Sequence, residues 1–584
     1  MALVWSRCGD APRGLRAAER ALRLAPGMAD ALLARVFALI RLGRMDEAEA
    51  GLLPILLQRP LYPPALLRLT QLRIEQGRAD EAFVTLSQLL ADLPPALAAE
   101  ARALLGQALT MTGLTTGARQ AFETALRLDP SWFEAGRRLM ALHFEAGRFD
   151  DGLRSYRALA AHDPDPLRAG SILLYSLNFD PRVDDTALVR LHREWAAGLP
   201  VPHPAALARD AGGTLRVGFM GARIGRHPVG YFLQPFLSQR RRTTAILYDD
   251  ARVPDDLAVR LRGMADGWRS TAGLSDETVW EMIRTDGLDV LVDLSGHGGG
   301  NRLPVLARRA APVQVSWLDY FATTGVPAMD YALFDRVSVP PGYEGFFTET
   351  IVRLPECRFC YAPPDYAPPV APPPAATNGF ITFGSFNKLE KLTPAVVALW
   401  SRVLCSIPGS RLVLKWQTLA DLSEQVEVRR RFAAHGIGAD RVALRGQSSH
   451  PAMLAEYADI DIALDPFPYN GGLTSCEALW MGVPVLTLAG QRPVSRQTMG
   501  FLTVLGLSGL VAHDHDGFVA AALALAGNRG RLSDLRRDLR GQMAASPLCD
   551  GGRFAAHLEW ALARMVERAR AGLPPLSFDV PEGV

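Results

Sequence analysis

The stretch "IDIALDPFPYNGGLTSCEALWMGVPVLTLAG" (460–490) combines two apolar strands, a glycine turn and a helix. The first strand, at 461–465, runs into the turn "NGG", and the second strand, "PVLTLAG", covers 484–490. Apolar strands that alternate with helices across short connections are typical of a parallel, doubly wound sheet. Such sheets bind their ligands at the carboxyl ends of the strands. We therefore expect the turn after the first strand to lie at a ligand site.

The same segment has the pattern of a phosphate site. Glycines let a diphosphate approach the backbone, and the free N–H groups and dipole of a helix start attract negative charge. Hydroxyl residues stand where the helix begins, and Glu477 follows within its first turn, where it can accept hydrogen bonds from a ribose. A plain N-capped helix is the alternative, and the flanking "DPFPY" and "GVPVLTLAG" argue against it. The predicted ligand-binding residues here are Asn470, Gly471, Gly472, Thr474, Ser475 and Glu477.

Strands and helices also alternate on both sides of a proline-rich tract, "APPDYAPPVAPPPAATNG" (362–379), which we interpret as a semi-rigid linker. This pattern predicts two doubly wound, Rossmann-like domains in tandem, with a ligand cleft between them. The expected strands are 215–221, 243–250, 289–296 and 312–320 before the tract, and 380–387, 411–416, 441–446, 460–468 and 484–490 after it.

The first 165 residues are an internal repeat. Gly9, Gly43, Gly77, Gly113 and Gly147 recur at intervals of 34, 34, 36 and 34 residues, and a proline closes each unit. Helix pairs repeated at this period stack into a solenoid with a concave groove. We favour a groove that holds a protein over the alternative, a stability or dimerisation module. The expected domains are the solenoid (1–165), a helical linker (166–212), two α/β domains (213–361 and 380–548) flanking the tract, and a C-terminal helix and tail (549–584).

Composition excludes several classes of protein. The formal net charge is +2, so nothing indicates a nucleic-acid-binding face. No apolar run reaches the roughly 20 residues that cross a bilayer, which argues against a membrane span. Six scattered cysteines fit a reducing cytoplasm better than a disulfide scaffold. Cys357 and Cys360 lack the second ligand pair of a structural zinc site, so no metal is expected.

Lysine is rare and clustered. All three lysines, Lys388, Lys391 and Lys415, fall within 28 residues, whereas the chain has 63 Lys plus Arg in total. Asn387, Lys388 and Lys391 follow an expected strand, where a compact ammonium can neutralise a departing diphosphate without a metal. No acidic triplet suited to a cation lies near these motifs. His227 precedes Pro228 at an expected helix start, whose dipole favours the neutral imidazole, although a lone histidine is more often structural.

Several of these motifs resemble, in order, the O-linked N-acetylglucosamine transferase family and its Spindly-type O-fucosyltransferase relatives. They include "GFMGARIGRHPVGYF", "DLSGHGGGNRL", "FGSFNKLEKLTP" and "DPFPYNGGLTSCEALWMGVPVLTLAG". The resemblance implies a GT-B fold and an inverting, metal-independent transfer from a nucleotide sugar to Ser or Thr of a protein. The tetratricopeptide repeats would hold this protein acceptor. A homodimer through the repeats is also possible. The resemblance further implies that His227 lies in the active site, that His227 or Asp286 removes or relays the proton of the acceptor hydroxyl, and that Lys391 and Thr474 bind the diphosphate. Glu477 would bind the ribose.

The chain also departs from the family pattern. Gly472, Leu473 and Thr474 replace His-Thr-Thr, and "LDYFATTG" (318–325) replaces "LGYPGTSG", with Asp319 and Ala322 in place of glycines. Met453 falls near the register of the base-stacking histidine. UDP-N-acetylglucosamine is the default donor, with GDP-fucose or UDP-glucose as alternatives. A repeat scaffold with an inactive transferase unit is the third possibility.

Overall fold

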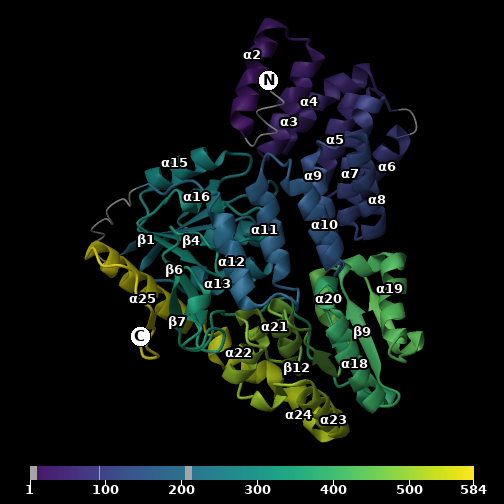
Figure 1. Cartoon of the computed structure of the whole chain (residues 1–584), viewed down its shortest axis with the longest axis vertical. Helices are drawn as coiled ribbons and strands as arrows, with labels where there is room; N and C mark the ends of the chain where they lie inside the picture. Colours follow the sequence, from purple (N-terminus) through teal and green to yellow (C-terminus); the bar gives the residue numbers. More distant parts are fainter. Residues whose placement is uncertain (1–9, 91–92, 204–213) are drawn as a thin grey trace.

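The computed structural model describes residues 10–90, 93–203 and 214–584. A helical N-terminal region leads into two α/β lobes that lie side by side (Figure 1). Among the described residues, no helix combines the length and the apolar character that a membrane crossing needs.

The N-terminal region is the expected solenoid of paired helices. Gly43, Gly77, Gly113 and Gly147 each have φ between +69° and +78° at the turn inside a pair, a conformation that glycine adopts without steric strain. This requirement explains their regular spacing. The helices are α2 (Ala11–Leu24), α3 (Ala29–Arg41), α4 (Met45–Gln58), α5 (Pro63–Glu75), α6 (Ala79–Leu89), α7 (Pro95–Met111), α8 (Thr115–Leu128), α9 (Phe133–Glu145) and α10 (Phe149–Ala160).

Two further helices, α11 (Pro166–Leu177) and α12 (Asp185–Ala196), connect the solenoid to the lobes. They run down the middle of the molecule, along the N-terminal lobe (Figure 1). The side chain of Asp165 caps α11 by accepting from the backbone N–H of Arg168 at 3.1 Å. The predicted helical linker is thus part of the packed structure.

The N-terminal lobe contains an eight-stranded, fully parallel sheet of order β14-β7-β6-β5-β4-β1-β2-β3. Its central strands are buried on both faces, which explains their continuous apolar sequence. The strands are β1 (Leu215–Gly221), β2 (Thr243–Asp249), β3 (Gly267–Ser270), β4 (Val290–Asp293), β5 (Val313–Ser316), β6 (Tyr331–Asp335), β7 (Thr350–Leu354) and β14 (Phe578–Asp579). The helices are α13 (Pro228–Gln239), α14 (Asp256–Met264), α15 (Asp276–Asp286) and α16 (Leu303–Ala307).

The C-terminal lobe contains a six-stranded parallel sheet of order β10-β9-β8-β11-β12-β13. The strands are β8 (Thr382–Ser385), β9 (Arg411–Lys415), β10 (Val442–Arg445), β11 (Ile462–Leu464), β12 (Val485–Leu488) and β13 (Val511–Ala512). The helices are α17 (Ala375–Asn378), α18 (Pro394–Ser406), α19 (Leu422–Ala433), α20 (His450–Glu456), α21 (Leu473–Trp480), α22 (Gln497–Val504), α23 (His515–Gly527) and α24 (Arg529–Ala544). The two sheets confirm the predicted pair of doubly wound domains.

The chain crosses between the lobes twice. The proline-rich tract is held against α24, because Arg540 donates to the carbonyl of Pro368 at 2.8 Å and Arg536 donates to that of Ala371 at 2.7 Å. After α24 the chain returns as α25 (Gly551–Arg570), which packs on α13, and β14 then pairs with β7. The C-terminal tail therefore completes the N-terminal lobe.

The solenoid is attached to both lobes. On the N-terminal lobe, the backbone N–H of Ala11 donates to the carbonyl of Gly273 at 3.1 Å, and Glu75 at the end of α5 forms an ion pair with Arg252. Both contacts fall in the first repeats, so this end of the solenoid rests on loops that follow β2 and β3.

The third full repeat contacts the C-terminal lobe. The backbone N–H of Thr116 donates to Asp421 at 2.7 Å, and Arg119 forms a buried ion pair with Glu424 at 3.0 Å. The turn is packed so closely that a methyl group added at Gly113 would lie 2.3 Å from a backbone oxygen of this lobe. The solenoid therefore spans the gap between the lobes.

Candidate active site

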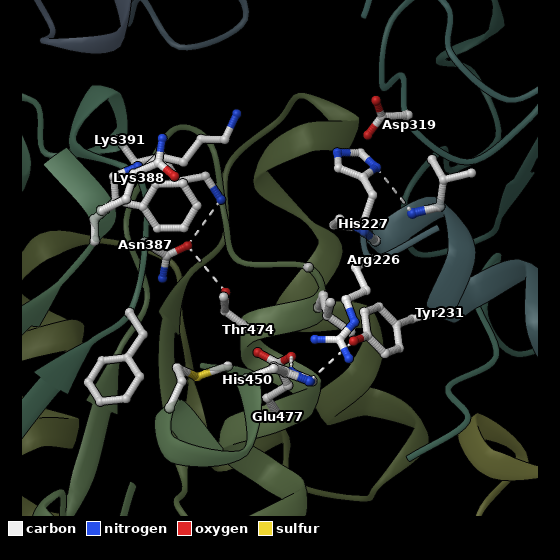
Figure 2. Close-up of a pocket in the computed structure, with 18 of the residues that line it drawn as sticks. Arg226, His227, Tyr231, Asp319, Asn387, Lys388, Lys391, His450, Thr474 and Glu477 are labelled. Atoms are coloured by element: carbon white, nitrogen blue, oxygen red, sulfur yellow. Dashed lines mark hydrogen bonds and ion pairs between the residues drawn. The ribbon is translucent and has the colours of Figure 1, made fainter. Parts of the chain in front are cut away.

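A cavity of about 490 Å³ lies between the two lobes. Its wall is built mainly from segments that directly follow the carboxyl ends of β1, β5, β8, β9, β10 and β11, as expected for doubly wound sheets. The residues that line it and carry polar or charged groups include Arg226, His227, Asp319, Asn387, Lys388, Lys391, Lys415, His450, Thr474 and Glu477. Figure 2 shows most of these side chains around one shared space.

The glycine turn before α21 is held rigidly. The carboxylate of Asp465, directly after β11, accepts from the backbone N–H of Gly471 at 2.6 Å and from the hydroxyl of Thr487 at 2.7 Å. A side chain at position 471 would lie 2.2 Å from the hydroxyl oxygen of Ser475, so only glycine fits there. The first turn of α21 thereby presents its backbone to the cavity through Gly472, as a phosphate site requires.

The hydroxyl residues of this helix start point in different directions. Thr474 lines the cavity and donates to the Oδ1 atom of Asn387 at 3.3 Å (Figure 2). Ser475 is buried and shares a hydrogen bond of 2.9 Å with Thr498 behind the helix. The fully buried Asn470 side chain donates to the carbonyl of Pro466 at 2.8 Å instead of facing the cavity. Asn470 and Ser475 therefore support the turn, whereas Thr474 faces the cavity.

Lys391 lies at the centre of the C-terminal wall. Its ammonium donates to the Oδ1 atom of Asn387 at 3.1 Å and to the backbone carbonyl of Asn470 at 2.8 Å, and it sits 4.7 Å from the ring centre of Tyr469. Burial lowers the pKa of Lys391 to about 7, against the opposing attraction of Asp465. An anion that enters the cavity would restore the charged form, because opposite charges at close range favour ionisation.

His227 is the N-cap residue of α13, on the facing wall of the cavity. The backbone N–H of Val229 lies 3.4 Å from Nδ1, and the guanidinium of Arg223 lies 3.3 Å from Nε2. Burial, and then the positive charges of Arg223 and Lys388, hold the pKa of His227 well below its ordinary value. This lowered pKa favours the neutral imidazole at physiological pH, through burial and neighbouring positive charges.

The floor of the cavity is a hydrogen-bonded group around His450. Its Nε2 atom lies 2.8 Å from the buried carboxylate of Glu477, and its Nδ1 atom lies 2.7 Å from the hydroxyl of Tyr366 and 3.1 Å from that of Tyr231. Burial raises the pKa of Glu477, whereas the imidazole favours its charged form. Met453 lines the cavity nearby. Glu477 is thus available to hydroxyl groups from the cavity side only.

Asp286 does not line the cavity. It is the last residue of α15, where its carboxylate accepts from the hydroxyl of Tyr248 at 2.7 Å and from Arg269 at 2.8 Å. Both partners belong to the N-terminal sheet, β2 and β3, away from the cavity loops. This placement does not support the expectation that Asp286 accepts a proton from a ligand in the cavity.

Aromatic residues of the cavity come from an unexpected element. Tyr175 on α11 and Phe179 just after it line the cavity, so the linker closes one side. Phe179 stacks on Tyr469 with 4.1 Å between ring centres and 9° between planes. No sequence signal marked these positions, because an aromatic residue in a linker helix looks the same whether it meets a neighbour or a ligand.

Two lobes of this kind define a class of protein: two-domain enzymes that bind a phosphate-bearing ligand in the cleft between parallel sheets. In this molecule a buried lysine and a helix start provide the positive charge. Cys357 and Cys360 are buried free thiols, and the described ranges contain no cluster of three or more His, Cys, Asp or Glu able to hold a metal ion.

Comparison with known proteins gives the family. The model of glycosyl transferase family 41 matches residues 194–362 and 375–558, and a tetratricopeptide-repeat model matches residues 7–60 and 67–131. The chain belongs to glycosyl transferase family 41, since the match covers more than half of it.

Relatives and solved structures agree with this assignment. The chain is 36% identical over 435 residues to the rice protein named "Probable UDP-N-acetylglucosamine--peptide N-acetylglucosaminyltransferase SPINDLY", and 36% identical over 429 residues to the Arabidopsis thaliana protein of that name. These matches cover 72% and 71% of this chain but 47% and 46% of the relatives, so the chain spans about half their length. A lysine-to-methionine mutant of Thermobaculum terrenum O-GlcNAc transferase superposes with a TM-score of 0.82 at 34% identity, covering 87% of this chain and 98% of that one.

Proposed function

We propose that the protein transfers a sugar from a nucleoside diphosphate sugar to Ser or Thr of protein acceptors, with inversion and without a bound metal. UDP-N-acetylglucosamine is the proposed donor, in keeping with the names of its relatives. The observation that carries this proposal is the pairing of Lys391 with the open helix start at Thr474 on one cavity wall. Their positive charge is placed where a diphosphate leaving group would develop negative charge.

We propose one orientation of the donor in the cavity. The diphosphate would contact Lys391 and the backbone at Gly472, and the nucleoside would extend toward Glu477 and His450 on the floor. The sugar would then face the aromatic pair of Phe179 and Tyr469 and the opposite wall at His227. Inversion follows if the acceptor hydroxyl attacks from the side of the sugar opposite the diphosphate.

The acceptor would be a protein segment bound by the repeats. The solenoid is fixed to both lobes, and Tyr175 on α11, the linker helix that follows the solenoid, lines the cavity. A bound segment would therefore be delivered toward the sugar rather than held at a distance. Pairing of two copies through the repeats stays a prediction that the oligomeric state in solution tests.

A donor screen tests the proposal. The purified chain is incubated with UDP-N-acetylglucosamine, GDP-fucose or UDP-glucose and lysate proteins, and modified peptides are identified by mass spectrometry. Calorimetry with UDP and GDP separates the bases. Transfer from UDP-N-acetylglucosamine supports the proposal, and transfer from another donor replaces only the sugar. Neither transfer nor hydrolysis of any donor would instead indicate a repeat scaffold with an inactive transferase unit.

A further inference from the structure

Asp319 stands on the cavity wall of the N-terminal lobe, in the loop that follows β5. Figure 2 shows its carboxylate beside the imidazole of His227, across the cavity from Lys391. No described residue donates a hydrogen bond to this carboxylate. Carboxylates removed from water normally have such partners, so an unpartnered one in a ligand cavity is available to the ligand.

The loop that carries Asp319 is held in a strained shape. Leu318 has a φ of +82°, which a branched, non-glycine residue adopts only where its surroundings impose it. The fully buried guanidinium of Arg358 imposes it, by donating to the carbonyl of Leu318 at 3.2 Å and to that of Tyr320 at 3.3 Å. The same guanidinium lies over the rings of Phe321, Phe334 and Phe359. The carboxylate is thus positioned by a rigid support.

The charges around Asp319 keep it ionised but weakly basic at neutral pH. Burial raises its pKa to about 6, and the positive charges of Arg223, Lys388 and Arg358 limit the rise. Other titratable groups whose charges couple to it or that lie beside it are Asp293, Tyr175, Tyr469 and His227. A carboxylate with a proton affinity close to the working pH is suited to general base catalysis.

His227 is less suited to the same task. Both of its ring nitrogens face N–H donors, Val229 and Arg223, although a neutral imidazole has one acceptor nitrogen. Accepting a further proton would turn the imidazole into a positively charged imidazolium, buried beside the guanidinium of Arg223. His227 can orient a hydroxyl group, but taking its proton is unfavourable.

We propose that Asp319 accepts the proton of the acceptor hydroxyl, an inference that rests on the proposed sugar transfer. The acceptor oxygen forms a bond to the anomeric carbon while the bond from that carbon to the donor phosphate oxygen breaks. The electron pair of the broken bond leaves with the nucleoside diphosphate, which Lys391 and the start of α21 stabilise. The hydroxyl proton moves to a carboxylate oxygen of Asp319.

The test compares Asp319→Asn with Asp286→Asn, the carboxylate outside the cavity. Asp319→Asn is expected to lower kcat/KM for transfer by about 10²–10⁴-fold, the range typical of a general base. Its Kd for UDP should stay within about threefold of the wild-type value, because no nucleotide contact is lost. Asp286→Asn should keep its kcat/KM for transfer within about threefold of the wild-type value.

The pH profile separates a base from a structural residue. In the wild-type protein, kcat/KM should fall below an apparent pKa of about 6, and this acid limb should be absent from the residual activity of Asp319→Asn. A kcat/KM of Asp319→Asn within about tenfold of the wild-type value, or an unchanged acid limb, would overturn the assignment. Loss in Asp286→Asn alone would return the role to that residue. A wild-type protein that transfers no sugar would contradict the proposed function itself.

Discussion

Replacing Lys391 with methionine removes the positive charge that this side chain carries beside a bound diphosphate and keeps nearly the same side-chain volume. The ammonium is buried, with 8% of its residue surface exposed, and is fixed by Asn387 and the carbonyl of Asn470 at 3.1 and 2.8 Å. It therefore cannot be replaced by a neighbouring lysine without rearranging the wall. A donor diphosphate at hydrogen-bond distance would place its charge about 4 Å from the nitrogen.

The magnitude follows from this separation. At an effective dielectric constant of about 20, two unit charges about 4 Å apart attract by about 4 kcal/mol. If that attraction is gained mainly as the leaving group develops its charge, its loss lowers kcat by about 10³-fold, at about 1.4 kcal/mol per factor of ten. The fold should survive, because two effects on stability oppose each other. The carbonyl of Asn470 loses its donor, which is destabilising, but the wall also loses a buried ammonium, which is stabilising.

The assay is release of nucleoside diphosphate from the donor at saturating concentration, with thermal unfolding of both proteins as the control. Lys388→Met is the comparison, since that ammonium forms an ion pair with Glu390 at 3.2 Å and neutralises less of a bound diphosphate. A fall in kcat of less than tenfold for Lys391→Met, with an unchanged unfolding temperature, would refute the leaving-group role. An equal loss in both variants would show that the effect is one of general charge.

Three further predictions test other parts of the molecule. Because burial lowers the pKa of Lys391 to about 7, this side chain is mostly neutral at pH 8 in the free protein. Binding of a nucleoside diphosphate should therefore take up close to one proton and weaken as pH rises. Calorimetry in buffers of different ionisation enthalpy measures this proton uptake, and Lys391→Met should abolish it. Gly113→Ala should destabilise the protein by more than the roughly 1–2 kcal/mol expected for Gly77→Ala. Both glycines have a φ of +78°, but only Gly113 touches the C-terminal lobe. Equal unfolding midpoints of the two variants in urea would show that the solenoid does not dock there. Arg358→Leu should lower both the unfolding temperature and the rate of sugar transfer. It removes the donor to the carbonyls of Leu318 and Tyr320, at a cost of about 1–3 kcal/mol per group. An unchanged transfer rate would show that this support is dispensable.

The repeats and the two sheets could be predicted because their signals are local. Gly43, Gly77 and Gly147 recur where the backbone needs a positive φ, and the buried parallel strands are continuously apolar. The short strand β14 carried no such signal. Its pairing with β7 depends on α25 crossing back to the N-terminal lobe, which no pattern within two residues can encode.

The candidate site was predicted where residues follow the ends of strands. Lys391 and Thr474 come after β8 and β11, and the topology of a parallel sheet brings such positions to one edge. Asp286 ends a helix instead, and the sequence does not show which way a helix end faces. Asp319 was noticed as a departure from a motif, but its proximity to His227 depends on the path of a strained loop that Arg358 supports.

The attachment of the solenoid at two separate places has a mechanical consequence. A solenoid that is docked on both lobes resists their rotation apart. Widening the cavity enough to exchange nucleotides therefore requires either the loss of one docking contact or bending of the stacked repeats. A polypeptide bound along the concave side of the solenoid would stiffen it. Occupancy of the repeats would thereby change the work needed to admit or release the small molecule, coupling two substrates that never touch until the moment of reaction.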